Sequence, residues 1–324
     1  MTPDTGFSVP RDEFGPFWPF HPSFETNLCI AALFGLSTGI HVLQAILHRT
    51  GFCWVIVMGG LWETFAFVLR TLGSQNGTVP VYYIISSVLF NLAPLWINAF
   101  LYMMAARLIY YCLPDHKVFN IHATTLAKTF VCLDIVCFLG QAGGGAVMQK
   151  SGESDEPENM WKLGHGIYIF GCAAQLCFLA LFAVLMVAFR RKVNQEGGSA
   201  EGTRRVIFLE AVIYVILLLI TVRVTYRLIE FGQGTGHDNP IISNENYAIF
   251  LDAVPMIVAF FLLNAGHPGI VMRGVDGNFG RGKEKHELLQ DEDRPTSGSR
   301  LVWLRNNLEE WRYNYDLELR DLRR

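Results

Sequence analysis

Seven ionisable side chains lie inside stretches of the sequence that are otherwise apolar. Such groups are costly in an apolar medium, and in membrane proteins they usually face the interior of a helix bundle. The seven are Glu63, Arg70, Asp134, Arg223, Arg227, Glu230 and Asp252. Four acids and three bases are nearly balanced in charge. They predict either a network of ion pairs or a polar cavity that binds an amphiphile or an ion.

Spacing brings several of these side chains onto shared helical faces. Glu63 and Arg70 are seven residues apart, which separates them by only about 20° around a helix. Arg223, Arg227 and Glu230 follow at i, i+4 and i+7, so they share one face. Amide side chains extend the polar stripes on further segments: Asn91, Asn98, Gln141 and Gln175. We expect these stripes to converge on one interior.

Two interpretations of this polar set compete. In the first, acids and bases pair across helices and only hold the bundle together, while small residues allow close packing. In the second, the set lines a cavity. We favour the cavity because small residues and hydroxyl groups could pack helices without the cost of seven ionisable groups. Asp134 and Asp252 are the expected proton relays, since neither has a basic residue within one helical turn.

The elements that must position these residues are seven apolar stretches. Each is long enough to cross a bilayer as a helix of about 20 residues. Only 17% of the 324 residues are charged, against about 25% in soluble domains. The chain is therefore predicted to be an all-α membrane protein, a seven transmembrane helix bundle. The expected spans are residues 28–47, 52–72, 81–104, 126–147, 165–189, 206–229 and 248–271.

Basic residues lie mostly in alternate connections between these spans. The segments 48–51, 105–125 and 190–205 and the start of the tail contain them, whereas the other connections have few or pair them with acids. Cytoplasmic loops carry the excess of Lys and Arg in membrane proteins. We therefore expect the N-terminus outside and the C-terminus in the cytoplasm.

This orientation divides the chain into three parts. Residues 1–27 form an extracellular N-terminal segment, and residues 28–272 form the transmembrane domain. Residues 273–324 form a cytoplasmic tail, with a linker followed by an amphipathic helix near 301–322. The sequon that begins at Asn76 falls on the expected outer side, where it is a possible glycosylation site.

Several classes of chemistry are disfavoured by the sequence. A net charge of −3 does not fit a strongly basic nucleic-acid binder. The sequence has no Cys-x-x-Cys and no His-x3-His, so neither a compact zinc site nor an intramembrane metal-dependent hydrolase is expected. It also has no Gly-x4-Gly-Lys-Ser/Thr nucleotide-binding motif. We expect no metal, no cofactor, no nucleic-acid partner and no enzymatic activity.

A set of short motifs runs in order along almost the whole apolar body. They include Glu63-x6-Arg70, Leu92-Ala93-Pro94, Asp134 with Gln141 and Gly143-Gly144-Gly145, Arg223-x3-Arg227-x2-Glu230, Asp252 with Pro255, and His267-Pro268-Gly269. On these residues the chain resembles the fungal RTA-like lipid-translocating exporter family, whose name refers to resistance to an aminosterol. One departure is Phe65-Ala66-Phe67, where the family often has a Gly-Tyr pair.

The resemblance implies a plasma-membrane protein that exports or flips sphingoid bases, sterol-like molecules or other toxic amphiphiles. Its expected partners are membrane lipids or amphiphilic small molecules, and the sequence leaves the oligomeric state open. The alternative is a seven-helix receptor or sensor of lipid-like ligands. The common form of such receptors is opposed by Ala105-Ala106-Arg107, which has no acid before the Arg, and by the lack of Asn-Pro-x-x-Tyr in span seven.

Overall fold

The computed structural model describes residues 18, 20–48, 50–153, 158–195, 200–232 and 241–271. Seven helices in this part of the chain are long and apolar enough to cross a membrane, which confirms the predicted all-α, seven-span architecture. The expected helix near 301–322 lies outside the described residues. The sidedness of the termini and the three-part division of the chain stay predictions.

Six of the spans are single long helices and the seventh is composite. The six are α2 (Phe24–Leu47), α3 (Trp54–Gln75), α4 (Pro80–Cys112), α5 (Ala123–Glu153), α6 (Glu158–Gln195) and α7 (Ala200–Gly232). The seventh joins α8 (Glu245–Ala248), the π-helical turn η2 (Ile249–Ala253) and α9 (Val254–Ala265). A 3-10 turn, η1 (Gly51–Cys53), precedes α3, and a short helix, α10 (Pro268–Val271), follows α9. Asn76 is the C-cap residue of α3, in the short connection to α4.

The composite seventh span follows from its proline. Pro255 has no N–H, so the carbonyl group four residues earlier cannot receive the usual helical hydrogen bond from it. A widened π turn directly precedes this position, and Asp252 lies within that turn. Turns of this kind are frequent at functional sites. The helix begins earlier than the predicted 248 and ends at Ala265, where Gly266 and Pro268 interrupt it.

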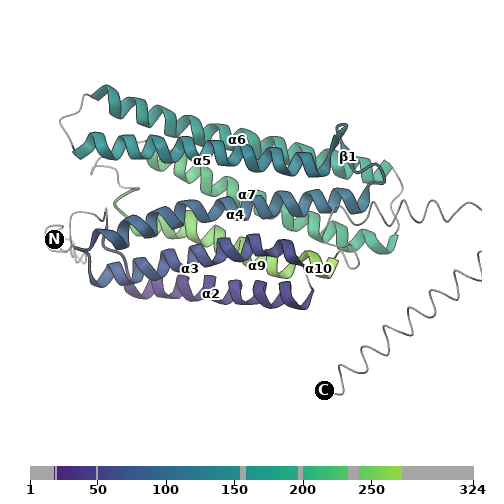
Figure 1. Cartoon of the computed structure of the whole chain (residues 1–324), viewed down its shortest axis with the longest axis horizontal. Helices are drawn as coiled ribbons and strands as arrows, with labels where there is room; N and C mark the ends of the chain where they lie inside the picture. Colours follow the sequence, from purple (N-terminus) through teal and green to yellow (C-terminus); the bar gives the residue numbers. More distant parts are fainter. Residues whose placement is uncertain are drawn as a thin grey trace, which may run out of the picture. The chain divides into compact units, whose positions relative to one another are not determined.

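The helices form a closed ring. Each span packs against the next one along the chain, and α9 returns to pack against α2. The α4 helix also contacts α6 and α7, and Figure 1 shows it between the α2–α3 pair and the α5–α6 pair. Polar side chains on α3, α4, α7 and the seventh span can therefore meet inside the ring.

The α5 and α6 helices approach closely at two glycines. A Cβ atom built on Gly144 would lie 2.6 Å from the carbonyl oxygen of Gly164, and one on Gly164 would lie 2.8 Å from the carbonyl oxygen of Gly144. Larger residues would force the backbones apart. Small residues serve the same purpose at many helix interfaces within membranes.

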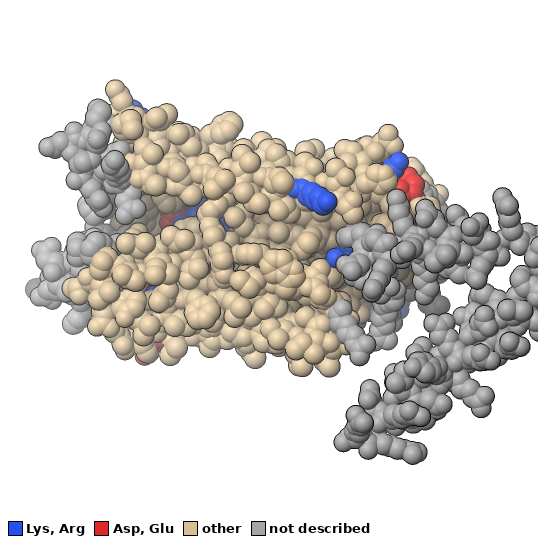
Figure 2. Space-filling view, in the orientation of Figure 1, with Lys and Arg blue, Asp and Glu red and all other residues tan. Residues whose placement is uncertain are grey.

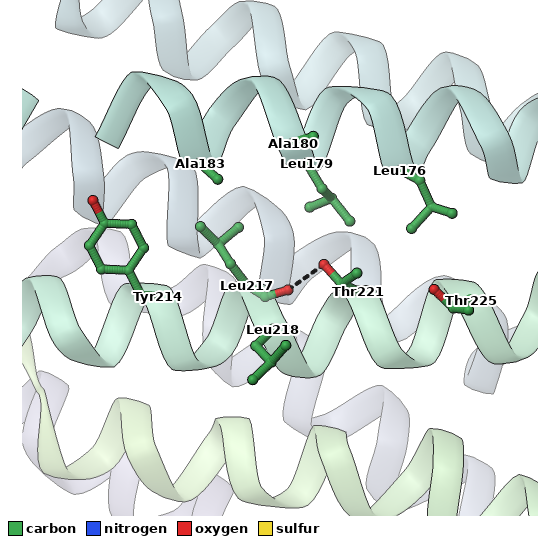
Figure 3. A pocket seen from close by; sticks show the side chains of 9 residues that line it. All are labelled: Leu176, Leu179, Ala180, Ala183, Tyr214, Leu217, Leu218, Thr221 and Thr225. Atoms are coloured by element: carbon green, nitrogen blue, oxygen red, sulfur yellow. Dashed lines mark hydrogen bonds between the residues drawn. The ribbon is translucent and has the colours of Figure 1, made fainter. Parts of the chain in front are cut away.

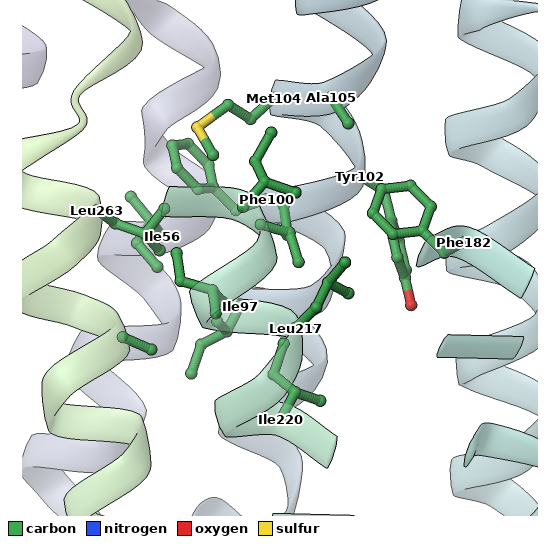
Figure 4. Packing of buried hydrophobic residues seen from close by; sticks show 14 of the residues in the cluster. Ile56, Ile97, Phe100, Tyr102, Met104, Ala105, Phe182, Leu217, Ile220 and Leu263 are labelled. Atoms are coloured by element: carbon green, nitrogen blue, oxygen red, sulfur yellow. The ribbon is translucent and has the colours of Figure 1, made fainter. Parts of the chain in front are cut away.

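Apolar side chains fill the centre of the ring and also cover much of its outside. Ile56, Ile97, Phe100 and Leu263 are fully buried, and Figure 4 shows them packed together. Large apolar side chains such as Phe170 are exposed on the outer faces of the helices. Figure 2 shows a face with few charged side chains over the helices. This surface suits a hydrocarbon environment.

A small hairpin connects α4 to α5. Strand β1 (Lys117–Val118) pairs antiparallel with β2 (Ile121–His122), with Val118 opposite Ile121. The two turn residues, Phe119 and Asn120, have positive φ values of 50° and 62°. This combination is that of a type I′ turn, which matches the twist of a two-residue hairpin.

Candidate functional site

The most highly charged part of the interior surrounds Asp252, which is fully buried. Arg223 pairs with one carboxylate oxygen of Asp252, and Arg227 Nη2 lies 2.6 Å from the other. Arg227 also pairs with Glu230 through Nη1 and Oε2 at 2.9 Å. We call these four residues the ionic cluster. Because α7 presents its three members at i, i+4 and i+7, one face of α7 is joined to the π turn of the seventh span.

Two aromatic side chains complete the ionic cluster. The hydroxyl group of Tyr226 donates a hydrogen bond of 2.8 Å to Glu230 Oε1. The ring of Phe90, on α4, lies within cation–π distance of two guanidinium groups of the cluster, 5.4 Å from Arg223 and 5.3 Å from Arg227. Sequence spacing gives no signal for Phe90, because its role depends on how α4 meets α7.

Arg70 extends this arrangement onto α3. Its guanidinium group lies 5.4 Å from the centroid of the same Phe90 ring. It is also near Phe67, at 5.6 Å, and Phe20, at 5.5 Å. Three arginines thus surround the ring of Phe90, and the negative face of an aromatic ring is attractive to such cations.

Glu63 differs from the other acids of this region. It is fully buried on α3, and neither carboxylate oxygen has a hydrogen-bond partner among the described residues. The charges that act on it are those of Arg223, Asp252, Arg227 and Arg70. Among the residues that the structure describes, Glu63 therefore lies beside the ionic cluster without an ion pair of its own.

A second polar group lies between α4 and α5. Asp134 Oδ2 accepts hydrogen bonds from Asn98 Nδ2 at 2.7 Å and from the Tyr102 hydroxyl group at 2.9 Å. We call these three residues the Asp134 cluster. The Tyr102 ring packs against Phe182 at 4.7 Å (Figure 4). In the part of the chain that the structure describes, Asp134 Oδ1 has no hydrogen-bond partner.

The amides of the predicted polar set fall into three places. Asn98 belongs to the Asp134 cluster, whereas Gln141 donates to Gln175 at 3.0 Å and joins α5 to α6. Asn91 is exposed and donates to the carbonyl oxygen of Ser87 on its own helix, at 2.9 Å. The expected single interior is therefore divided, and Asn91 lies outside it.

The two expected proton relays also have different surroundings. Asp252 lies between two arginines of α7, which spacing along its own helix could not reveal. The hydrogen-bond partners found for Asp134 are both neutral. Within the described residues, no group of three or more His, Cys, Asp or Glu side chains could hold a metal ion.

Glu245 forms a further link that spacing does not predict. Its carboxylate accepts a hydrogen bond of 2.8 Å from the backbone N–H of Ser23 and one of 2.7 Å from Asn27 Nδ2. These bonds join the start of α8 to the N-cap of α2. They close the ring of helices at the end where Arg70 and Phe20 lie.

Comparisons with known proteins give a family match and several similar chains. The sequence profile of a family described as RTA1 like protein matches residues 56–275. The chain is similar to the probable lipid transporter atnI of Emericella nidulans, with 35% identity over 86% of this chain and 74% of the relative. It is also similar to protoporphyrin uptake protein 1 of Saccharomyces cerevisiae, with 31% identity over 64% of this chain and 66% of the relative. The sphingoid long-chain base transporter RSB1 of the same yeast is 25% identical over 78% of this chain and 73% of the relative. No solved structure matches.

Proposed function

This chain belongs to the RTA1-like protein family, and we propose that it is a membrane lipid translocator. Its substrates are long-chain amphiphiles with an amine-bearing or otherwise polar head, such as sphingoid bases or sterol-like molecules. The head passes through the polar interior beside the ionic cluster while the apolar part stays in contact with hydrocarbon. The relatives named as lipid and sphingoid base transporters support this substrate class over a receptor.

The observation that carries the proposal is the unpaired carboxylate of Glu63 beside a set of buried ion pairs. An ionisable group within a membrane span is expensive and marks a substrate or ion pathway by default. The ammonium group of a sphingoid base would give Glu63 the positive partner that it lacks. The neighbouring guanidinium groups of Arg70 and Arg223 suit a phosphate or carboxylate head.

The proposal also covers location and chemistry. The seven apolar spans and the named relatives make this an integral membrane protein. We place it in the plasma membrane, with the N-terminus outside as the distribution of basic residues predicts. Its role is transport without a covalent reaction, and residues of the ionic cluster bind and orient the head rather than catalyse.

The test is transfer of a fluorescent sphingoid base across the bilayer of proteoliposomes. The Glu63→Gln substitution keeps the size of the side chain and breaks no hydrogen bond of the described structure. We expect it to abolish transfer while the thermal unfolding temperature stays the same. The matched control is Asn91→Ala, a polar position on the exposed side of α4, which should transfer at the unmodified rate. Full transfer by the Glu63→Gln protein would refute the proposal.

A further inference from the structure

A groove lies between α6 and α7, and its lining includes no residue of the ionic cluster or the Asp134 cluster. Its volume is about 450 Å³, which is within the usual range for small-molecule sites. Figure 3 shows side chains from both helices facing the space between them. Ala180 and Ala183 contribute only methyl groups on the α6 side, which leaves the hollow.

The lining of the groove is suited to hydrocarbon. Leucines from both helices dominate it, among them Leu176 and Leu218. The hydroxyl group of Thr221 donates to the carbonyl oxygen of Leu217 at 2.7 Å, so its hydrogen bond is made within α7 (Figure 3). The groove extends from Tyr214 to Thr225, which is roughly 16 Å along a helix. This length suits part of an extended acyl chain.

The groove opens on a face that meets lipid in a membrane. Leu218, which lines it, is 63% exposed, and Val184, which follows Ala183 on α6, is 57% exposed. Water does not surround such a face within a bilayer. The molecules that can enter from the side are therefore those with hydrocarbon chains.

Charged groups lie beyond one end of the groove. Tyr214 lines that end, and Glu210 lies one turn earlier on α7. Arg190 Nη1, from α6, lies 3.3 Å from Glu210 Oε2. The Arg190 side chain is 29% exposed, so part of its set of five N–H donors is open to a ligand. The guanidinium group of Arg190 is suited to a phosphate, whereas the Glu210 side chain is only 6% exposed and is paired with Arg190.

From these contacts we propose that the α6–α7 groove is a binding site for a membrane phospholipid. One acyl chain fills the groove between Ala180 and Thr221. The phosphate binds Arg190, whose ion pair with Glu210 holds the guanidinium group in place. The site is separate from Glu63, so it goes beyond the proposed translocation and does not depend on it.

The first test uses a phosphatidylethanolamine that carries a diazirine on one acyl chain. The full chain is placed in phosphatidylcholine vesicles with this probe, illuminated, and the labelled peptides are mapped by mass spectrometry. We expect labels to concentrate at 176–183 and 214–225. Equal labelling of all lipid-facing helices would overturn the proposal, as would photochemical crosslinks that join these helices to a second copy of the chain.

Substitutions test the groove itself. Ala180→Trp fills the space that the acyl chain needs, and labelling there should fall by about tenfold, within the range expected for overpacking a close fit. Leu181→Trp, on the exposed side of the same helix, is the matched control and should keep the label. Both proteins are compared by thermal unfolding, and Ala183→Trp replaces Ala180→Trp if the latter does not fold. Unchanged labelling of a folded groove variant would overturn the site.

The head is tested with a second probe. Arg190→Gln should weaken labelling by the phosphatidylethanolamine probe but not by a diacylglycerol with the same diazirine chain, because the latter has no phosphate. Equal labelling by both probes in the unmodified protein would refute recognition of the head. Glu63→Gln should leave the labelling pattern intact, so failure of the translocation proposal and failure of this one give different results.

Discussion

The ionic cluster and the Asp134 cluster are both buried inside the ring of helices, and each contains one aspartate that is almost fully inaccessible. Asp252 is paired with two arginines, whereas the hydrogen bonds to Asp134 come from an amide and a phenol. The first arrangement balances full charges, and removal of one member leaves the others uncompensated. The second holds an acid by neutral groups, which are less costly to leave unsatisfied. Burial alone therefore does not indicate what a polar residue contributes.

Removal of the two aspartates gives the largest expected contrast. Asp252→Ala leaves Arg223 and Arg227 without their shared carboxylate, and we expect a loss of about 3–5 kcal/mol of unfolding free energy. Asp134→Ala leaves two neutral donors unsatisfied and should cost about 1–3 kcal/mol. Denaturant titration of both purified variants in the same detergent measures the difference. Equal losses of unfolding free energy would show that the charges of Arg223 and Arg227 do not make the ionic cluster more sensitive to substitution than the Asp134 cluster.

A second contrast separates the cation–π contacts from simple packing. Phe90 and Phe182 are both buried aromatic residues, but the arginines lie around Phe90 and Tyr102 packs against Phe182. Replacement of either by Leu removes a similar volume. We expect Phe90→Leu to cost about 1–2 kcal/mol more than Phe182→Leu, because several desolvated guanidinium groups lose the ring face. The readout is again the unfolding free energy, and a smaller loss for Phe90→Leu would contradict this account.

The sequence predicts the helices well because each span is a long apolar stretch with a simple physical requirement. It also predicts that Arg223, Arg227 and Glu230 share a face, since that depends on one helix alone. It does not predict which acid they meet. Pairing of Asp252 with α7 depends on the ring closure and on the π turn before Pro255, and both are tertiary features. The same holds for Phe90, whose neighbours come from α3 and α7.

An ion pair near the ends of the apolar spans provides a solvent-exposed case to compare with the two buried clusters. Asp115 and Lys192 join the loop after α4 to the end of α6, with Nζ and Oδ2 2.5 Å apart, and both are partly open to solvent. The hydrogen bond from Lys192 holds the pKa of Asp115 below its ordinary value. Lys192 also donates to the carbonyl oxygen of Lys117 at 3.0 Å, so the hairpin keeps one attachment when the aspartate is changed.

Asp115→Asn should have the smallest effect of the three contrasts. Because the pKa of Asp115 is lowered in the folded protein, its stabilisation is present above the ordinary value of about 3.9 and is lost as the pH falls through the folded value. The unfolding temperatures of the two proteins should therefore differ slightly at pH 7 and converge in acid. Exposed ion pairs are screened and weak. If Asp115→Asn destabilised the protein as much as Asp252→Ala, solvent exposure would not explain the difference in stability between this surface ion pair and the buried ionic cluster.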